Sequence, residues 1–333
     1  MPEPLIWLTE QDVVSLIGME DAVAALESGL RTLGAGDGFN VPKALATWGD
    51  GNSMHSLGSG FPELGLVGFK NWVHTRRGAT ALFNLFDAHN GSLLAVMEAA
   101  ALGQLRTSAM SGVATKWLAA PDADAMALIG TGAQAVTQIA AVNAVRPLKR
   151  LNVFSPTPEK RRAFAELVRD SVDFEVVECA SAAEASDGMP IVTLVTRAVD
   201  PFFTADMLAP GAHLNAVGAI LPHSSEFTQD VFGRASVLVT DDLPNLQRAS
   251  REFVEYFGAD GDWSSVQRLS DLIAQGWTRP ETCDVTLFKA MGMGISDLSM
   301  AIVALERARE QGTGTGIRHP QRAKPRWQAR SVA

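Results

Sequence analysis

Residues 125–138, which read AMALIGTGAQAVTQ, constrain the fold of this chain more than any other stretch. Five mostly apolar residues form a short buried-strand pattern, which breaks at Gly130-Thr131-Gly132, and a helical apolar pattern then begins at Val136. A strand, a glycine turn and a helix in this order form the phosphate-binding corner of a Rossmann unit, where free helical N–H groups face a pyrophosphate. We therefore expect Gly130 and Gly132, with Ala133 and Gln134 at the helix start, to contact a dinucleotide.

The segment after this corner alternates between strand and helix patterns. We expect strands near 151–154, 175–178, 191–195, 213–217 and 236–240, and helices over 158–170, 182–186 and 225–235. Such alternation predicts a parallel sheet built from βαβ units.

The first 120 residues have a different texture. A capping box at Thr9 opens a helix, and a second helix ends near Gly34. Four strand-like segments follow, over 53–60, 65–73, 81–87 and 92–98, and Asn90-Gly91 marks a hairpin turn between the last two. A helix is expected over 102–118, so this region is predicted to be antiparallel sheet with helices. Residues 285–309 read as one long helix interrupted by glycines, and residues from Gln311 onward as a mobile tail.

Composition excludes several classes of protein. The net charge is −9, and nucleic-acid binding needs a basic surface, so no nucleic-acid partner is expected. Cys179 and Cys283 are the two cysteines and have no metal-ligand spacing, so no metal site is expected. Residues 125–145 carry no charge, but their Gly, Gln, Thr and Asn content favours a buried strand and helix over a membrane span. With no signal-peptide pattern at residues 1–12, we expect a cytoplasmic protein without a membrane partner.

The end of the second expected Rossmann strand bears on the choice of dinucleotide. NAD-preferring units place an acidic residue there to bind the ribose hydroxyls. Here Ser155 and Thr157 are followed by Lys160, Arg161 and Arg162, a set that suits a 2′-phosphate. The alternative is that the three cations are simply the solvated face of a helix. We expect Ser155, Thr157 and Arg161 to contact the cofactor, and NADP(H) to be favoured over NAD(H).

Two cations lie in apolar settings. Arg106 is on the apolar stripe of its predicted helix, where a guanidinium needs an anionic partner. That partner is either a structural carboxylate or the carboxylate of a substrate. Lys70 lies in the middle of a predicted strand, where a lysine is more often a device against edge-strand aggregation than a ligand-binding group. Lys43 is by position alone an ordinary loop lysine.

Five segments together resemble the ornithine cyclodeaminase/mu-crystallin family. They are VGFKNWV, LRTSA, IGTGAQA, LNAVGAILPHSSEF and VTLFKAMGMGISD. The resemblance implies an α/β fold in which a central Rossmann domain, over 121–298, is joined to a discontinuous α+β substrate and dimerisation domain. The second domain would comprise 1–120 and 299–318, leaving a flexible tail over 319–333. It also implies a homodimer.

The resemblance also implies roles for single residues. Lys70 and Arg106 correspond to the catalytic lysine and arginine that hold the α-carboxylate of an amino or imino acid, and Lys70 would also act on a proton at the reacting nitrogen. Lys43 stands where the family has a further arginine, and it keeps the charge but loses the bidentate fork. The implied cofactor contacts on other elements are Thr107, Thr196, Val217 and Gly218.

One departure from the family pattern bears on the reaction. Ring-forming cyclodeaminases carry an aspartate where this chain has Ile220, and isoleucine can neither accept a proton nor pair an ammonium group. We therefore expect an NAD(P)H-dependent imine reductase or amino-acid dehydrogenase acting on a small imino or amino acid. Two alternatives remain open: an ornithine cyclodeaminase in which His223 or Glu226 replaces the aspartate, and a crystallin-like NADPH-binding protein with little catalysis.

Overall fold

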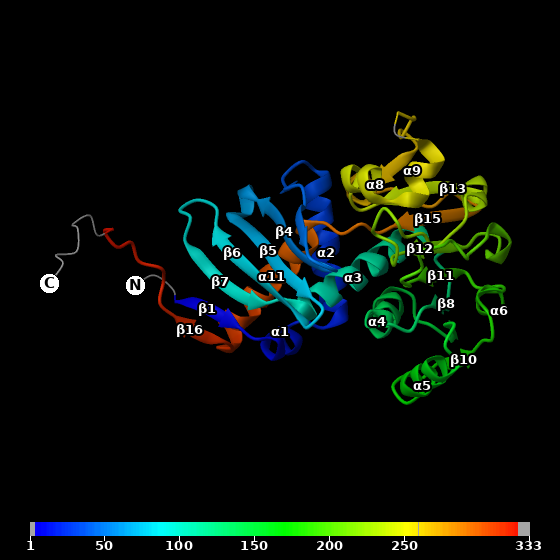
Figure 1. Cartoon of the computed structure of the whole chain (residues 1–333), viewed down its shortest axis with the longest axis horizontal. Helices are drawn as coiled ribbons and strands as arrows, with labels where there is room; N and C mark the ends of the chain where they lie inside the picture. The colour runs from blue at the N-terminus through cyan, green and yellow to red at the C-terminus, as the bar shows by residue number, and fades with distance from the viewer. Residues whose placement is uncertain (1–3, 259, 326–333) are drawn as a thin grey trace.

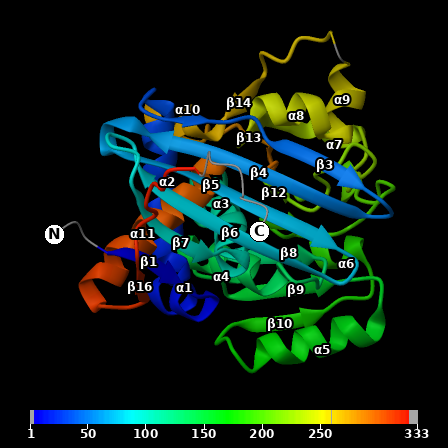
Figure 2. The same ribbon diagram turned by 60° about the vertical axis from the view of Figure 1, so that its left-hand side comes forward.

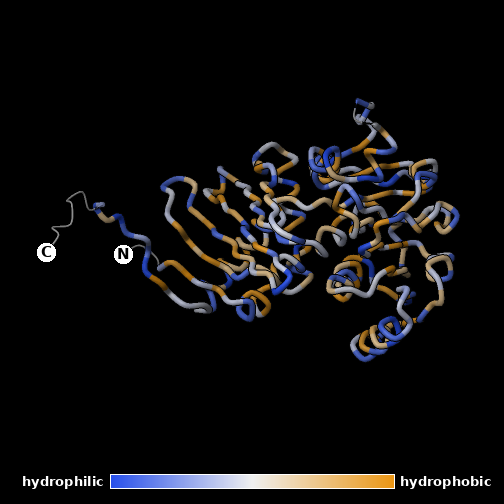
Figure 3. Tube along the Cα trace, in the orientation of Figure 1, coloured by the Kyte–Doolittle hydropathy of each residue, from blue (hydrophilic) through white to orange (hydrophobic). Residues whose placement is uncertain are grey.

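The computed structural model describes residues 4–258 and 260–325. They form two eight-stranded sheets that lie side by side and are joined by helices (Figure 1). Figure 3 shows hydrophobic stretches on the strands of both sheets and on the helices around them. The chain starts in the first sheet, builds the second, and returns to the first.

The first sheet is largely antiparallel and has the order β16-β1-β7-β6-β5-β4-β2, with β3 paired to β4. Its strands are β1 (Leu5–Leu8), β2 (Phe39–Asn40), β3 (Ala44–Trp48), β4 (Asn52–Phe61), β5 (Leu66–Thr75), β6 (Gly78–Asp87), β7 (Leu93–Glu98) and β16 (Thr315–Ile317). Alternate residues of β5 point to opposite faces, as the pleat requires, so the row Gly68 and Lys70 is buried while Phe69 and Val73 are exposed. The four expected strands correspond to β4 through β7.

Helices cover the buried face of this sheet. α11 (Gly294–Gln311) packs on β4, β5 and β6, and α2 (Met19–Gly34) packs on α11 and on α3 (Ala100–Leu118). α1 (Glu10–Leu16) begins at the predicted capping box, in which Thr9 and Asp12 exchange hydrogen bonds. α3 also packs on α4 (Ala135–Val145), which follows the first strand of the second sheet, so α3 contacts both halves of the molecule.

The second sheet is entirely parallel, with the order β10-β9-β8-β11-β12-β15-β13-β14. Its strands are β8 (Ala125–Ile129), β9 (Arg150–Phe154), β10 (Glu175–Glu178), β11 (Ile191–Leu194), β12 (His213–Ala216), β13 (Ala235–Thr240), β14 (Val266–Arg268) and β15 (Val285–Lys289). The remaining helices are α5 (Pro158–Arg169), α6 (Ala182–Ser186), α7 (Asp230–Arg234), α8 (Leu243–Ala249), α9 (Arg251–Phe257) and α10 (Leu269–Gln275). The strand order reverses between β8 and β11, which is where a doubly wound sheet binds its ligand. The predicted α/β class with a Rossmann domain is confirmed.

Three expectations from the sequence are wrong. Residues 285–309 are not one helix: the fully buried Val285–Lys289 forms β15 between β12 and β13, and the helix begins only at Gly294. The helix expected over 225–235 is reduced to α7. The mobile tail expected from Gln311 does not begin there, because β16 (Thr315–Ile317) pairs with β1. Residues 326–333 of the expected tail lie outside the described residues.

Candidate active site

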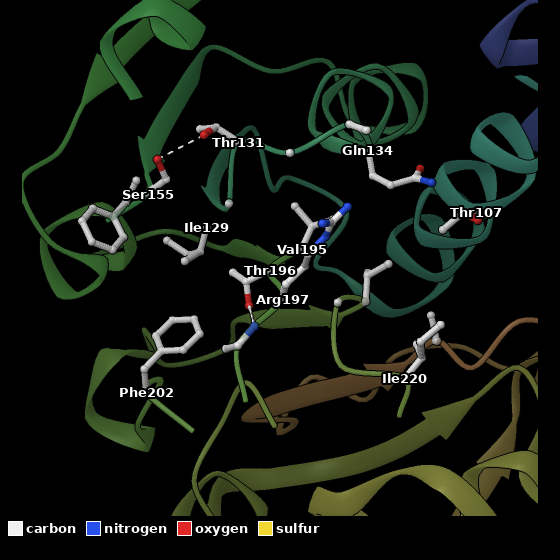
Figure 4. Close-up of a pocket in the computed structure, with 18 of the residues that line it drawn as sticks. Thr107, Ile129, Thr131, Gln134, Ser155, Val195, Thr196, Arg197, Phe202 and Ile220 are labelled. Atoms are coloured by element: carbon white, nitrogen blue, oxygen red, sulfur yellow. Dashed lines mark hydrogen bonds between the residues drawn. The ribbon is translucent and has the colours of Figure 1, made fainter. Parts of the chain in front are cut away.

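A cavity of 980 Å³ opens at the carboxyl ends of β8, β9 and β11, between the second sheet and α3. Figure 4 shows its walls, with Gln134 and Thr107 on one side, Ser155 and Phe202 on the other, and Thr196 between them. Ten of the eleven predicted cofactor residues line it: Thr107, Gly130, Gly132, Ala133, Gln134, Ser155, Thr157, Thr196, Val217 and Gly218. These ten residues, from several elements, therefore lie around a single cavity.

The glycine corner is shaped to receive a phosphate group. Gly130 has φ of +116°, and a Cβ at this position would lie 2.7 Å from the carbonyl oxygen of Val195, so only glycine fits. A Cβ on Gly132 would meet no atom within 4 Å, so this part of the loop presents bare backbone to open space. α4 starts directly after it, with no side chain capping its first N–H groups. A pyrophosphate bound here would meet those N–H groups and the positive end of the helix dipole.

Arg161 is not among the residues that line the cavity. Its Nε lies 3.0 Å from Oε1 of Glu178, and its Nη1 donates to the carbonyl oxygen of Ser155 at 2.9 Å. Glu178 lies at the end of β10, the strand next to β9, and so outside the segment 155–162 on which the sequence prediction was based. Lys160 and Arg197 are instead the cations that line the cavity together with Arg106.

A buried glutamate holds the floor of the cavity together. Glu226 is fully buried, and its Oε1 accepts hydrogen bonds from the amide and hydroxyl of Thr196 at 2.7 and 2.8 Å. Its Oε2 accepts from the amides of Gly218 and Ala219 at 2.8 and 3.2 Å. Burial raises the pKa of this carboxyl, and Lys289 opposes the rise. The side chain thus links the ends of β11 and β12, and both of its oxygens are occupied by these hydrogen bonds.

Three cations gather beside the cavity, on the buried side of the first sheet. Lys70 lies on β5, which pairs with both β4 and β6, so the edge-strand explanation for this lysine is wrong. Its Nζ lies 5.5 Å from the centre of the Trp72 ring, and Nζ of Lys43 lies 5.4 Å from the same centre. Burial lowers the pKa of Lys43, and the nearby Arg106 and Lys70 lower it further. Arg106 lines the cavity, whereas Lys43 and Lys70 are not among its lining residues.

Asp297, in the first turn of α11, is the structural carboxylate that pairs with two of these cations, Lys70 and Arg106. Its Oδ1 lies 3.0 Å from Nζ of Lys70, and its Oδ2 lies 3.7 Å from Nε of Arg106. Burial lowers the pKa of Lys70, and the charge of Asp297 opposes that fall. A second buried acid, Asp241, lines the cavity and accepts from the amides of Met291 and Gly292. Burial raises the pKa of Asp241 to about 6.

Sequence reasoning did not assign a role to either aspartate. Asp297 closes the motif VTLFKAMGMGISD, so its presence was visible, but its pairing with β5 and α3 depends on how distant segments meet. Asp241 follows a strand directly, and an acid at the carboxyl end of a parallel strand was a signal that could have been used.

Gly103 of α3 provides a test of how closely Lys70 must be placed. A Cβ at Gly103 would lie 2.5 Å from Nζ of Lys70. Gly103→Ala should therefore displace the Lys70 ammonium and lower kcat/KM for the reaction at this site at least about tenfold. The better helix propensity of alanine should meanwhile add up to about 1 kcal/mol to the free energy of unfolding. Gly233→Ala on α7, where a Cβ meets no atom within 4 Å, is the control. Steady-state kinetics and thermal melts of both variants check this, and unchanged kinetics in Gly103→Ala would contradict it.

Together the parallel sheet and the cavity define a dinucleotide-binding protein of the Rossmann class. The chain belongs to the ornithine cyclodeaminase/mu-crystallin family, whose model matches residues 6–312. It is 30% identical over 275 residues to the Delta(1)-pyrroline-2-carboxylate reductase of Bacillus cereus, covering 79% of this chain and 83% of that protein. It is 34% identical over 218 residues to the ketimine reductase mu-crystallin of Rattus norvegicus, covering 65% of this chain and 66% of that protein.

A solved structure extends the comparison to the fold. The Delta(1)-pyrroline-2-carboxylate reductase of Thermococcus litoralis, in complex with NADH and L-proline, superposes with a TM-score of 0.87 at 26% identity. The match covers 94% of this chain and all of the other. The fold of this chain, with both of its sheets, therefore matches that of a protein named as a reductase and solved with NADH.

Proposed function

We propose that this chain is an NAD(P)H-dependent reductase of a small imine that carries a carboxylate, with oxidation of the corresponding amino acid as the reverse reaction. The observation that carries the proposal is the convergence of Lys70 and Arg106 on Asp297, directly beside a cavity suited to a dinucleotide. Relatives named as imine reductases support it.

The proposed roles follow from charge and position. The guanidinium of Arg106 pairs with the substrate carboxylate, and Lys43 adds a second positive charge at the same side. These contacts fix the substrate so that its C=N carbon faces the cavity. The bound nicotinamide cofactor supplies the hydride to that carbon, or removes it in the reverse direction. Lys70 donates a proton to the imine nitrogen, so that the hydride and this proton together convert the imine into an amine.

Cyclodeamination of ornithine needs an acidic residue for the side-chain amine, and the structure offers none in the expected place. Ile220 lines the cavity at that position, and His223 is exposed and is not a lining residue. Glu226 is buried and bonded to backbone amides with both oxygens. Asp241, the one acid among the lining residues that the structure describes, is bonded to Met291 and Gly292. We therefore favour reduction over cyclodeamination.

Three measurements test this proposal against its two alternatives. Absorbance at the nicotinamide band detects imine reduction, mass spectrometry of the products detects cyclodeamination (which leaves the amount of NAD⁺ unchanged), and fluorescence titration detects NADPH binding. The purified protein is mixed with NADPH or NADH and with cyclic and linear imino acids, and separately with ornithine and NAD⁺. Oxidation of the reduced cofactor by one or more imines is the expected result. Proline and ammonia from ornithine, without imine reduction, would support the cyclodeaminase, and tight NADPH binding without any turnover would support the crystallin-like alternative.

We further propose that NADP(H) is preferred to NAD(H). The residues that line the cavity at the end of β9 are Phe154, Ser155, Pro156, Thr157 and Lys160, and none of them is acidic. Arg161 contributes less than expected, because Glu178 already pairs with it. Lys160 is therefore the principal partner that we assign to a 2′-phosphate.

Lys160→Ala should raise the Kd for NADPH about tenfold while leaving the Kd for NADH nearly unchanged, because only NADPH carries the 2′-phosphate. Arg162→Ala is the matched control, since Arg162 is on the same helix but does not line the cavity. Fluorescence titration of both cofactors measures these constants. Equal weakening of NADH and NADPH would contradict the assignment.

We also propose a homodimer formed through the outer face of the first sheet. Figure 2 shows this face of β4, β5 and β6 turned toward the viewer, with the helices behind it. Met54, Phe69 and Val73 lie on it and are 53%, 40% and 42% exposed. Register places Met54 opposite Val73, so these two side chains are neighbours, and Phe69 lies on the same face four residues along β5. Exposed apolar side chains gathered on one face of a soluble protein mark interaction surfaces.

Val73→Glu should convert the dimer to a monomer, because each protomer would bury a carboxylate without a partner in an apolar interface. Leu167→Glu, at an apolar side chain on α5 that is 58% exposed, is the control and should leave assembly unchanged. Sedimentation velocity distinguishes the two states. A wild-type protein that sediments as a monomer at micromolar concentration would contradict the dimer.

A further inference from the structure

Asp297 occupies an unusual position for a carboxylate. Its side chain is fully buried, in the first turn of α11, where that helix meets β5 and α3. The positive end of the helix dipole favours a negative charge there. A buried carboxylate is costly unless it is paired, so its partners define its task.

Its two oxygens are engaged unequally. Oδ1 accepts a hydrogen bond from Nζ of Lys70 at 3.0 Å. Oδ2 lies 3.7 Å from Nε of Arg106, beyond hydrogen-bond distance. Among the described residues, neither this Oδ2 nor this Nε has a hydrogen-bond partner. Lys70 is therefore held firmly, whereas Arg106 is held only by charge and keeps its donors for another anion.

Two glycines fix the places of these cations. The ammonium of Lys70 lies against Gly103, where a Cβ would come within 2.5 Å of it. Nη1 of Arg106 lies against Gly292, where a Cβ would come within 2.9 Å. Gly292 is in turn held by the hydrogen bond from its amide to Asp241. The backbone leaves room for both cations at one side of the cavity.

We propose that Asp297 is a positioning residue for imine reduction: it keeps the Lys70 ammonium protonated and aimed at the imine nitrogen, and leaves Arg106 free to take the substrate carboxylate. This inference rests on the proposed reductase function. It assigns to Asp297 a role in the protonation of substrate, exerted through Lys70 rather than by direct contact.

Loss of the Asp297 charge should change how activity depends on pH, because Lys70 must be protonated for reduction. Reduction consumes one hydride and one proton, and Lys70 must carry that proton, so activity is present below the pKa of Lys70 and is lost above it. Burial and Arg106 lower this pKa, whereas Asp297 and the more distant Glu10 raise it. Removing the charge of Asp297 lowers it further, because an opposite charge at this distance shifts a pKa by about one to three units.

Other charged groups face the same site and stay unchanged in the experiment. They are Lys43 before β3, His55 on β4, Asp241 after β13 and Arg248 on α8. The pKa of His55 is lowered by burial to about 4, so this side chain is neutral across the range of interest. Asp241, with a pKa of about 6, titrates on the acidic side of the profile. The pKa of Lys43 is lowered too, so Lys43 contributes to the alkaline limb of both proteins. The shift of that limb between wild type and Asp297→Asn, rather than its position, therefore reports on Lys70, because Asp297 is hydrogen-bonded to Lys70.

The test compares wild type with Asp297→Asn, which keeps the shape and a hydrogen-bond acceptor for Lys70 but removes the charge. The dependence of kcat/KM on pH is measured in the reductive direction with an imine that wild type turns over. The alkaline limb should move down by about one to three pH units, and lowering the pH should restore much of the lost activity. Asp21→Asn is the control, because Asp21 is also in the first turn of its helix and pairs with Arg307 far from the cavity.

Each outcome has one meaning. A loss of kcat/KM that is equal at every pH, with the limb unmoved, would overturn the inference and leave Asp297 a structural residue. If Asp297→Asn does not fold, Asp297→Ser, whose hydroxyl can still accept from Lys70, replaces it in the same comparison. Absence of turnover in wild type itself would refute the proposed function instead, so the two failures are distinguishable.

Discussion

Replacing Lys70 with methionine is expected to lower kcat/KM for imine reduction at least about a thousandfold, since general acid catalysis alone contributes 10²–10⁴. Methionine fills most of the buried volume of lysine but has neither a proton to donate nor a charge to hold a carboxylate. Binding of NADPH should persist, because Lys70 does not line the cofactor cavity. Steady-state kinetics and fluorescence titration of the cofactor measure the two quantities separately.

The loss of charge at Lys70 leaves Asp297 with a weaker set of partners, so stability must be controlled. Lys70→Met combined with Asp297→Asn removes both charges, and this double variant should fold and remain inactive. Lys149→Met is the matched control, because Lys149 also pairs with an aspartate, Asp124 at 2.7 Å, but on the surface. Full turnover by Lys70→Met would refute the role assigned to this lysine.

Glu226→Gln is expected to destabilise the protein by about 2–5 kcal/mol, although it changes only one atom's chemistry. The carboxylate accepts from Thr196 with one oxygen and from Gly218 and Ala219 with the other. The glutamine oxygen can accept from Gly218 and Ala219, but its NH₂ then faces Thr196, whose hydroxyl can turn to accept while its amide is left without an acceptor at about 1–3 kcal/mol. The change also removes the negative charge near the buried Lys289, which adds to the cost.

The same change should weaken cofactor binding. Thr196 and Gly218 line the cavity, and a Cβ on Gly218 would lie 2.1 Å from the carbonyl oxygen of Thr196, so the two strand ends fit closely. Chemical denaturation gives the free energy of unfolding, and fluorescence titration gives the Kd for NADPH. Glu255→Gln, at an exposed glutamate paired with Arg251, should change neither. Wild-type stability in Glu226→Gln would show that these hydrogen bonds contribute little.

The part of the candidate site that lines the cavity could largely be predicted from the sequence, because the glycine corner that shapes it is local. Gly130, Gly132 and the start of α4 lie within a few residues of one another. Thr196 and Val217 were assigned through the family resemblance, and they follow strands that the βαβ alternation predicts. The rule that ligands bind at the carboxyl ends of parallel strands then brings them together. Arg161 was assigned to the cofactor because its partner Glu178 lies on a neighbouring strand, whose position depends on the sheet order.

The substrate half could be predicted only in part. Lys70 and Arg106 were found through the family resemblance, but the carboxylate between them comes from residue 297, more than 190 positions away from either. The segment 285–309 was taken for one helix because a fully buried strand and a buried helix share an apolar pattern. Only the tertiary fold shows that Val285–Lys289 belongs to the parallel sheet and that α11 carries Asp297 to Lys70.

The central claim is that hydride is transferred to the carbon of a C=N bond beside Lys70 and Arg106. Turnover of a cyclic imino acid with NADPH that carries deuterium at the transferred position of C4 tests it most directly, with mass spectrometry and NMR of the amino-acid product. One deuterium on the α-carbon, present with wild type and absent with Lys70→Met, is the predicted result. A product without deuterium, or the same labelled product from Lys70→Met at the wild-type rate, would contradict the account.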